Sequence, residues 1–93
     1  MTFRLVYTES YVKKAKKKFL RIHPEIANQY EKTLKLLEVN PQHPSLRLHG
    51  LSGRLSGLSS VSINISYRIV LDIVIKDKDI ILIDVGNNDH VYR

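Results

Sequence analysis

Apolar residues recur at helical spacing in the first half of the chain and alternate with polar residues in the second half. The first helical stripe consists of Tyr11, Ala15, Phe19 and Ile22, and it predicts a helix from about Ser10 to Ile22. Pro24 then begins a second helix, whose stripe consists of Ile26, Ala27, Tyr30, Leu34 and Leu37. This helix should end near Val39, because Pro41 restricts the residue before it. A helical hairpin is therefore expected.

Strict alternation predicts strands on both sides of this hairpin. A short strand precedes it at Thr2 to Tyr7, where every second residue is apolar. The later set that should share one buried face is odd-numbered: Val61, Ile63, Tyr67, Ile69, Leu71, Ile73 and Ile75. A three-residue turn at Asn64–Ser66 keeps these residues on one face by pairing Ile63 with Tyr67, and it leaves Ile65 at an exposed tip.

The last strand, Ile80 to Val85, should return antiparallel after a polar turn. An odd-length turn pairs Leu71 with Val85 and Ile75 with Ile81, and places Arg68 opposite Asn88. It also puts Asp72 opposite Asp84, which is unfavourable for two carboxylates. The element order is β-α-α-β-β-β. It predicts an α+β fold, with the hairpin packed on a mostly antiparallel four-stranded sheet and its other face partly polar.

Length and composition favour one globular domain over residues 1–93. The chain has no cysteine, which excludes disulfides, thiolate metal sites and a thiol nucleophile. His43 has no second histidine or carboxylate at ligand spacing, so neither a metal nor another cofactor is expected. No apolar run reaches the roughly 18 residues that span a bilayer. We therefore expect a cytoplasmic protein without a membrane partner.

The net charge is +6 and the sequence pI is about 9.7. Much of the positive charge falls in the first predicted helix, at Lys13, Lys14, Lys16, Lys17, Lys18 and Arg21. Such a cluster indicates a polyanion or an acidic protein as partner. A solvated helix face remains the alternative interpretation.

Arg68 is the strongest candidate for chemistry, because it lies in a strand on the face opposite the apolar set. A guanidinium there could bind phosphate with two parallel hydrogen bonds. The alternative is a structural arginine paired with Asp72, Asp84 or the terminal carboxylate. His49, His90 and Tyr92 are further candidates, for acid/base work.

Two segments of the chain resemble a known family. The segment HGLSGRLSGLSSVSINISYRIVLDI, followed after a polar turn by IILIDVGNNDHVYR, resembles the RelE/ParE superfamily of toxins from bacterial and archaeal toxin-antitoxin pairs. The shared features are a Leu/Gly loop before a strand, Tyr-Arg opening the next strand, and a last strand that ends in Gly, a polar tetrapeptide and an apolar-aromatic pair. Element order and chain length also match.

The resemblance implies a type II toxin of the RelE/YafQ-like branch, which cuts mRNA on the ribosome without metal. Its partners would be a cognate antitoxin, the ribosome and mRNA. By position, His49 resembles a catalytic histidine, Arg68 a phosphate-binding arginine and Tyr92 a terminal aromatic that stacks or assists. The cationic residues expected to contact RNA are Lys13, Lys14, Lys17, Lys18, Arg47 and Arg54, although the two arginines are more readily explained as solvated loop residues than Arg68 is.

Some positions depart from the family pattern. Asn88 stands where active members commonly carry His or Arg, and Ser60 and Ser62 stand where they carry Lys or His. His49, or His90 if the tail shifts by two residues, would then transfer the protons. Two alternatives stay open: a ParE-type toxin that acts on DNA gyrase without nuclease activity, and a degenerate toxin that only binds its antitoxin.

Overall fold

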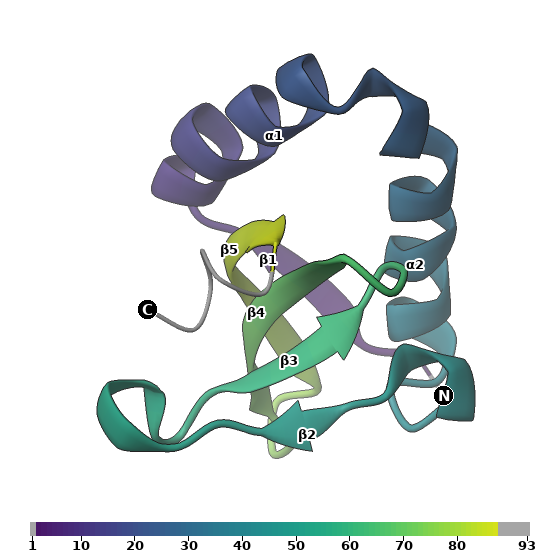
Figure 1. The fold of residues 1–93 in the computed structure, drawn as a ribbon. Coiled ribbons are helices and arrows are strands. Elements are labelled where there is room, and N and C mark those ends of the chain that lie inside the picture. Colours follow the sequence, from purple (N-terminus) through teal and green to yellow (C-terminus); the bar gives the residue numbers. More distant parts are fainter. Residues whose placement is uncertain (1, 88–93) are drawn as a thin grey trace.

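The chain folds into a mixed β-sheet with a helical hairpin folded around it (Figure 1). The structure is a computed structural model and describes residues 2–87. Within them, five strands lie in the order β1-β5-β4-β3-β2: β1 (Arg4–Tyr7), β2 (His49–Gly50), β3 (Ser59–Ser62), β4 (Tyr67–Val74) and β5 (Asp79–Asn87). The helical segments are η1 (Tyr11–Lys16), α1 (Lys17–Ile22), η2 (Pro24–Ile26), α2 (Ala27–Val39), η3 (Pro44–Leu46) and η4 (Gly53–Leu55). The predicted α+β class is confirmed.

The sheet has one strand more than predicted, because the two-residue strand β2 pairs antiparallel with Ser59 and Ser60 of β3. At the opposite edge, β1 runs parallel to β5. The Arg4 guanidinium reinforces that edge, since its Nε and Nη2 atoms donate to the two carboxylate oxygens of Asp79 at 2.9 and 3.1 Å. The remaining pairs are antiparallel.

The first helix is capped by Thr8, whose hydroxyl oxygen accepts a hydrogen bond from the Tyr11 backbone N–H at 3.1 Å. The segment that follows, η1, is π-helical. Hydrogen bonds from i to i+5 rotate the later residues away from the stripe expected for an α-helix. Phe19 is still buried. Ile22 was predicted to lie in the core but is 54% exposed.

The core lies between the helical hairpin and one face of the sheet. Its buried helical members are Tyr11, Phe19, Ile26, Tyr30, Leu34, Leu37 and Leu46. The sheet contributes Val61, Ile63, Ile69, Leu71, Ile80, Leu82 and Val85. The predicted odd-numbered face of β3 and β4 is therefore confirmed as far as Ile73, which packs against the core, whereas Ile75 is 74% exposed because it lies beyond the end of β4.

The predicted turn between β3 and β4 is also present. The Ile63 N–H donates to the Tyr67 carbonyl oxygen at 2.9 Å, and Ile65 is 89% exposed at the tip. The Asn64 side chain organises the turn, since its Oδ1 accepts from the Ser66 and Tyr67 N–H groups at 2.8 and 2.9 Å. These bonds fix the alignment of β4 against β3.

A β-bulge at Ile83 sets the alignment of β5 against β4. Val70 is opposite Asp84 and Leu71 is opposite Leu82, so Ile83 has no partner on β4. An extra residue reverses which side chains point inward. Before the bulge, the even-numbered residues Ile80 and Leu82 of β5 therefore point into the core. After the bulge, the odd-numbered residue Val85 does so.

The predicted β4–β5 register was wrong by two residues from Tyr67 to Val70 and by three from Leu71 to Val74. Arg68 lies opposite Gly86 rather than Asn88, and Ile69 rather than Leu71 lies opposite Val85. The two strands are joined by the four residues 75–78, not by an odd-length turn, with Lys78 in the left-handed region at φ 56°. The expected clash between Asp72 and Asp84 does not arise, because these residues pair with Ile81 and Val70.

Candidate functional site

The candidate site lies on the face of the sheet turned away from the core. Directly opposite residues of antiparallel strands project to the same face. One row across this face is His49, Ser60, Val70 and Asp84, and the next is Ser62, Arg68 and Gly86. His49 and Arg68 therefore share a face, two strand spacings of about 4.8 Å apart.

Arg68 is half-buried in the middle of this face, and its Nη1 atom is buried. Gly86 lies directly opposite Arg68 on β5 and is buried. Asp84 lies diagonally next to Arg68 across the same pair of strands, within reach of a long side chain. This position suits an arginine whose guanidinium is partly buried against the sheet and binds an anion with the part that remains accessible.

His49 is exposed on β2, and a hydrogen bond defines its tautomer. Its Nδ1 lies 3.2 Å from the carbonyl oxygen of Arg47. A carbonyl only accepts, so Nδ1 carries the proton and the neutral ring keeps a lone pair on Nε2. His49 could therefore take up a proton through Nε2.

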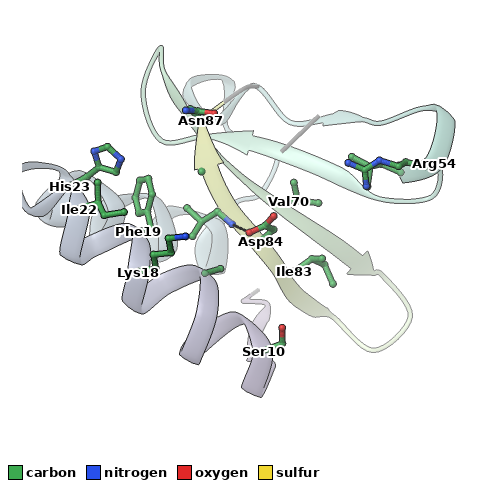
Figure 2. A pocket seen from close by; sticks show the side chains of 14 residues that line it. Ser10, Lys18, Phe19, Ile22, His23, Arg54, Val70, Ile83, Asp84 and Asn87 are labelled. Carbon is green, nitrogen blue, oxygen red and sulfur yellow. Dashed lines mark hydrogen bonds between the residues drawn. The ribbon is translucent and has the colours of Figure 1, made fainter. Parts of the chain in front are cut away.

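A groove of about 580 Å³ continues this face toward the first helix. Its floor includes Val70, Ile83, Asp84 and Gly86, one wall carries Lys18, Ile22 and His23 of the helical hairpin, and the other carries Arg54 and Leu55 of η4. Figure 2 shows Lys18 and Arg54 on opposite sides of the groove, with Val70, Ile83 and Asp84 between them. The groove therefore has a cation on each wall and a floor that carries both apolar side chains and the Asp84 carboxylate.

The lysines of the first helix do not form one uniform patch. Lys13 Nζ lies 2.7 Å from Glu9 Oε1, and Lys16 Nζ lies 5.6 Å from the centre of the Tyr7 ring. Lys17 is exposed on α1 outside the groove, whereas its neighbour Lys18 lines it. Lys14 belongs to η1. Of the six predicted RNA-binding residues, the structure brings Lys18 and Arg54 to one groove.

The remaining predicted residues differ in what the structure says of them. Arg47 is exposed, with a left-handed φ of 50° after η3. Ser60 is fully buried, and the Ser62 hydroxyl donates to the Asn64 carbonyl oxygen at 2.6 Å. Asn88, His90 and Tyr92 lie outside the described residues, so their roles stay predictions.

An aromatic cluster that the sequence did not predict lies at one end of the groove. The Tyr67 hydroxyl lies 3.1 Å from His23 Nδ1, and the His23 ring centre is 4.7 Å from that of Tyr67 and 5.1 Å from that of Phe19. The sequence shows His23 mainly as the residue that ends α1 before Pro24. His23 is four residues from Phe19, which places both side chains on the same helical face. This spacing is the sequence pattern from which the contact between them could have been predicted.

The structure indicates no metal centre and no membrane segment in the part of the chain that it describes. Residues 2–87 contain no group of three metal-ligating side chains. Among the same residues, no helix is long and apolar enough to cross a bilayer.

Known structures show the same architecture over nearly the whole chain. YafQ from E. coli strain BL21(DE3) superposes with a TM-score of 0.78 at 15% identity, covering 98% of this chain and 99% of YafQ. YafQ in the E. coli DinJ-YafQ toxin-antitoxin complex gives 0.76 at 16% identity, covering 100% of both chains. The chain has the RelE/YafQ toxin fold.

An archaeal RelE-RelB complex from Pyrococcus horikoshii OT3 extends this fold comparison. It gives a TM-score of 0.70 at 20% identity and covers 94% of this chain and 96% of the matched chain. No protein-family model matches the sequence, and no curated protein does. The RelE/YafQ fold is therefore established by the arrangement of elements, not by sequence identity.

Proposed function

We propose that this chain is the toxin of a type II toxin-antitoxin pair and cleaves mRNA on the ribosome. The observation that carries the proposal is that His49 and Arg68 share one face of a sheet with the RelE/YafQ fold. The basic helix and the net charge of +6 favour a polyanionic substrate. A cognate antitoxin is the second proposed partner, because YafQ and RelE neighbours were solved as complexes with DinJ and RelB.

The reaction needs an anion binder and two proton transfers. A ribose 2′-hydroxyl attacks the neighbouring phosphorus, and the bond to the 5′-oxygen breaks. His49 Nε2 accepts the 2′-hydroxyl proton, and the 5′-oxygen of the leaving strand takes a proton from solvent or from His90. Arg68 binds the phosphate and stabilises the additional negative charge in the transition state. The products are a 2′,3′-cyclic phosphate and a 5′-hydroxyl end.

The proposal is tested by inducing this chain in bacterial cells without a partner protein. We expect growth arrest and new transcript ends within translated regions. Arg68→Ala should abolish both, and Arg68→Lys should retain a small part of the activity, since an ammonium cannot reproduce the two-pronged contact. Lys35→Ala, an exposed residue of α2, is the matched control and should behave as wild type.

Two outcomes would contradict the proposal. DNA damage with intact transcripts would indicate a ParE-type toxin, and harmless expression of a folded protein would indicate a module that only binds an antitoxin. If Arg68→Ala is folded and cleaves at the wild-type rate, the assignment of the phosphate site is wrong. Circular dichroism of each variant separates these results from unfolding.

A further inference from the structure

The first helix contains one turn that is wider than an α-helical turn. In η1 the backbone is π-helical, and the N–H of Lys17 donates to the Val12 carbonyl oxygen, five residues earlier. Before this turn, the Val12 N–H donates to the Thr8 carbonyl oxygen at 3.0 Å. After it, the His23 N–H donates to the Phe19 carbonyl oxygen at 2.9 Å. A single π turn between α-helical turns is equivalent to one inserted residue, because it holds one more residue between donor and acceptor.

This inserted residue explains how Tyr11 and Phe19 can both be buried. In a regular α-helix, side chains eight residues apart point about 80° apart around the axis, whereas those seven apart differ by only about 20°. The π turn gives Tyr11 and Phe19 the smaller separation. The Tyr11 hydroxyl lies 2.5 Å from that of Tyr30, and the Phe19 ring centre lies 5.2 Å from that of Tyr67. These contacts fix the rotation of the helix on both sides of the π turn.

The same rotation selects the side chains that border the groove. Besides Phe19 and His23, the residues of the first helix that line it are Ser10, Ala15, Lys18 and Ile22 (Figure 2). With one inserted residue, Ser10, Lys18 and Ile22 lie within about 40° of one another around the axis. Lys17 and Arg21 are exposed on α1 and do not line the groove.

A regular α-helix held in place by Tyr11 would present a different wall. Its residues from Phe19 onward would be turned by about 100° relative to the observed structure. Lys17 and Arg21 would then face the groove, and Ile22 would enter the core, as the sequence pattern alone predicts. Lys18 would also turn toward the core, where its ammonium group is costly to bury.

We propose that the π turn in η1 determines the chemistry of this groove wall by setting the rotation of α1. It places one cation, Lys18, next to the apolar Ile22 in the groove, and it keeps Lys17 and Arg21 on the solvent side. The first helix thereby presents two chemically different faces. This inference concerns the helix itself, and it holds whichever ligand the groove binds and whether or not the protein cleaves mRNA.

The first test removes one residue from η1 in the full chain. Lys13 is suitable because its side chain is exposed and forms an exposed ion pair with Glu9, which contributes little to stability. Its deletion should convert the π turn into an α-helical turn while Phe19 keeps its rotation. The thermal midpoint should stay within about 5 °C of wild type, and the NMR contact between the rings of Phe19 and Tyr67 should remain.

Two changes of the same size serve as controls. Deletion of Lys35, an exposed residue in the regular helix α2, turns the buried Leu37 away from the core by about 100°. Insertion of one alanine after Lys13 turns Phe19 away by a similar angle. Each control should lower the thermal midpoint by at least about 10 °C, so that only the deletion in η1 is tolerated.

The second test changes the side-chain pattern instead of the length. Lys18→Leu/Phe19→Lys gives the first helix the apolar stripe of a regular α-helix. The Lys17 N–H should then donate to the Lys13 carbonyl oxygen instead of that of Val12. NMR couplings across hydrogen bonds identify the acceptor, and a purely structural loss of packing would not change it.

Two results would overturn the inference. The first is that deletion of Lys13 destabilises the chain as much as deletion of Lys35, which would show that the π turn does not act as an inserted residue. The second is a folded Lys18→Leu/Phe19→Lys chain in which the Lys17 N–H still bonds to Val12. If the double variant does not fold, the comparison of the two deletions decides alone.

Discussion

The Tyr11 hydroxyl lies 2.5 Å from the Tyr30 hydroxyl, inside the core between the first helix and α2. Both side chains are fully buried. Replacing one tyrosine by phenylalanine leaves the other hydroxyl buried without this partner. We expect Tyr11→Phe and Tyr30→Phe each to lower the free energy of unfolding by about 1–3 kcal/mol, measured by urea denaturation.

The double variant Tyr11→Phe/Tyr30→Phe is the control for this pair. Removing both hydroxyls leaves neither one without its partner. The double variant should therefore lose less unfolding free energy than the sum of the two single losses, and its stability should approach that of wild type. Additive losses would show that the two hydroxyls do not depend on each other.

The same tyrosines predict a loss of stability at alkaline pH. Burial raises the pKa of Tyr30 to about 12 and raises the pKa of Tyr11 further, whereas an unfolded tyrosine ionises near 10. Above about pH 10 the unfolded chain binds fewer protons, so the free energy of unfolding falls with pH. The slope should reach up to about 1.4 kcal/mol per pH unit for each tyrosine. Denaturation of the double phenylalanine variant at pH 8 to 11 should show a shallower decline than wild type.

The Thr8 cap predicts a moderate effect on the first helix. Its hydroxyl accepts from the Tyr11 N–H and donates to the Leu82 carbonyl oxygen at 3.3 Å. Thr8→Ala should cost about 1 kcal/mol of stability. Thr8→Ser keeps the hydroxyl and should recover most of that loss. Equal thermal midpoints for the alanine and wild-type chains would show that the cap is dispensable.

The Asn64 turn predicts a coupling between stability and the candidate site. Asn64→Ala removes two accepted backbone hydrogen bonds and should destabilise the protein by about 1–2 kcal/mol. Asp retains the acceptor oxygen, so Asn64→Asp should stay close to wild type. Because this turn aligns Arg68 with Ser62, amide exchange of β4 should increase in the alanine variant and remain slow in the aspartate variant.

Ser62 predicts a gain of activity. It lies directly opposite Arg68, where a histidine side chain would be about 5 Å away between Cβ atoms. Ser62→His supplies a proton carrier next to the proposed phosphate site and should raise the cleavage rate by at least about tenfold. Ser62→Asn, which cannot transfer a proton, is the control. An equal rate in both variants would show that proton transfer does not limit the reaction.

The sequence predicted the helical hairpin, the β3–β4 turn and the buried face of β4, because each depends on local periodicity. Its β4–β5 register failed at features without a periodic signal. Lys78 adopts a left-handed conformation without being glycine, and the apolar residue Ile83 is extruded at a bulge. The conformation of Lys78 and the position of the bulge are both determined by how β5 packs and pairs with the neighbouring strands.

The candidate site could be predicted in part for the same reason. Alternation alone placed Arg68 on the outer face, and Figure 1 shows how the loop of η4 extends from the β2–β3 side of the sheet. The groove itself depends on how α1 and η4 are positioned across β5, and no local pattern encodes that distance. His23 lines the groove because of this tertiary arrangement.

The bulge at Ile83 decides which side chains of β5 reach each face of the sheet. If β5 kept Ile83 but paired without a bulge, Ile83 would lie opposite Val70, Asp84 would enter the core and Val85 would turn outward. The hydrophobic core and the polar groove would then exchange residues without any substitution. Deletion of Ile83 has the opposite effect, because Leu82 and Asp84 keep their partners on β4 and the strand becomes regular. Alignments of related chains should therefore tolerate a gap at this position better than elsewhere in β5.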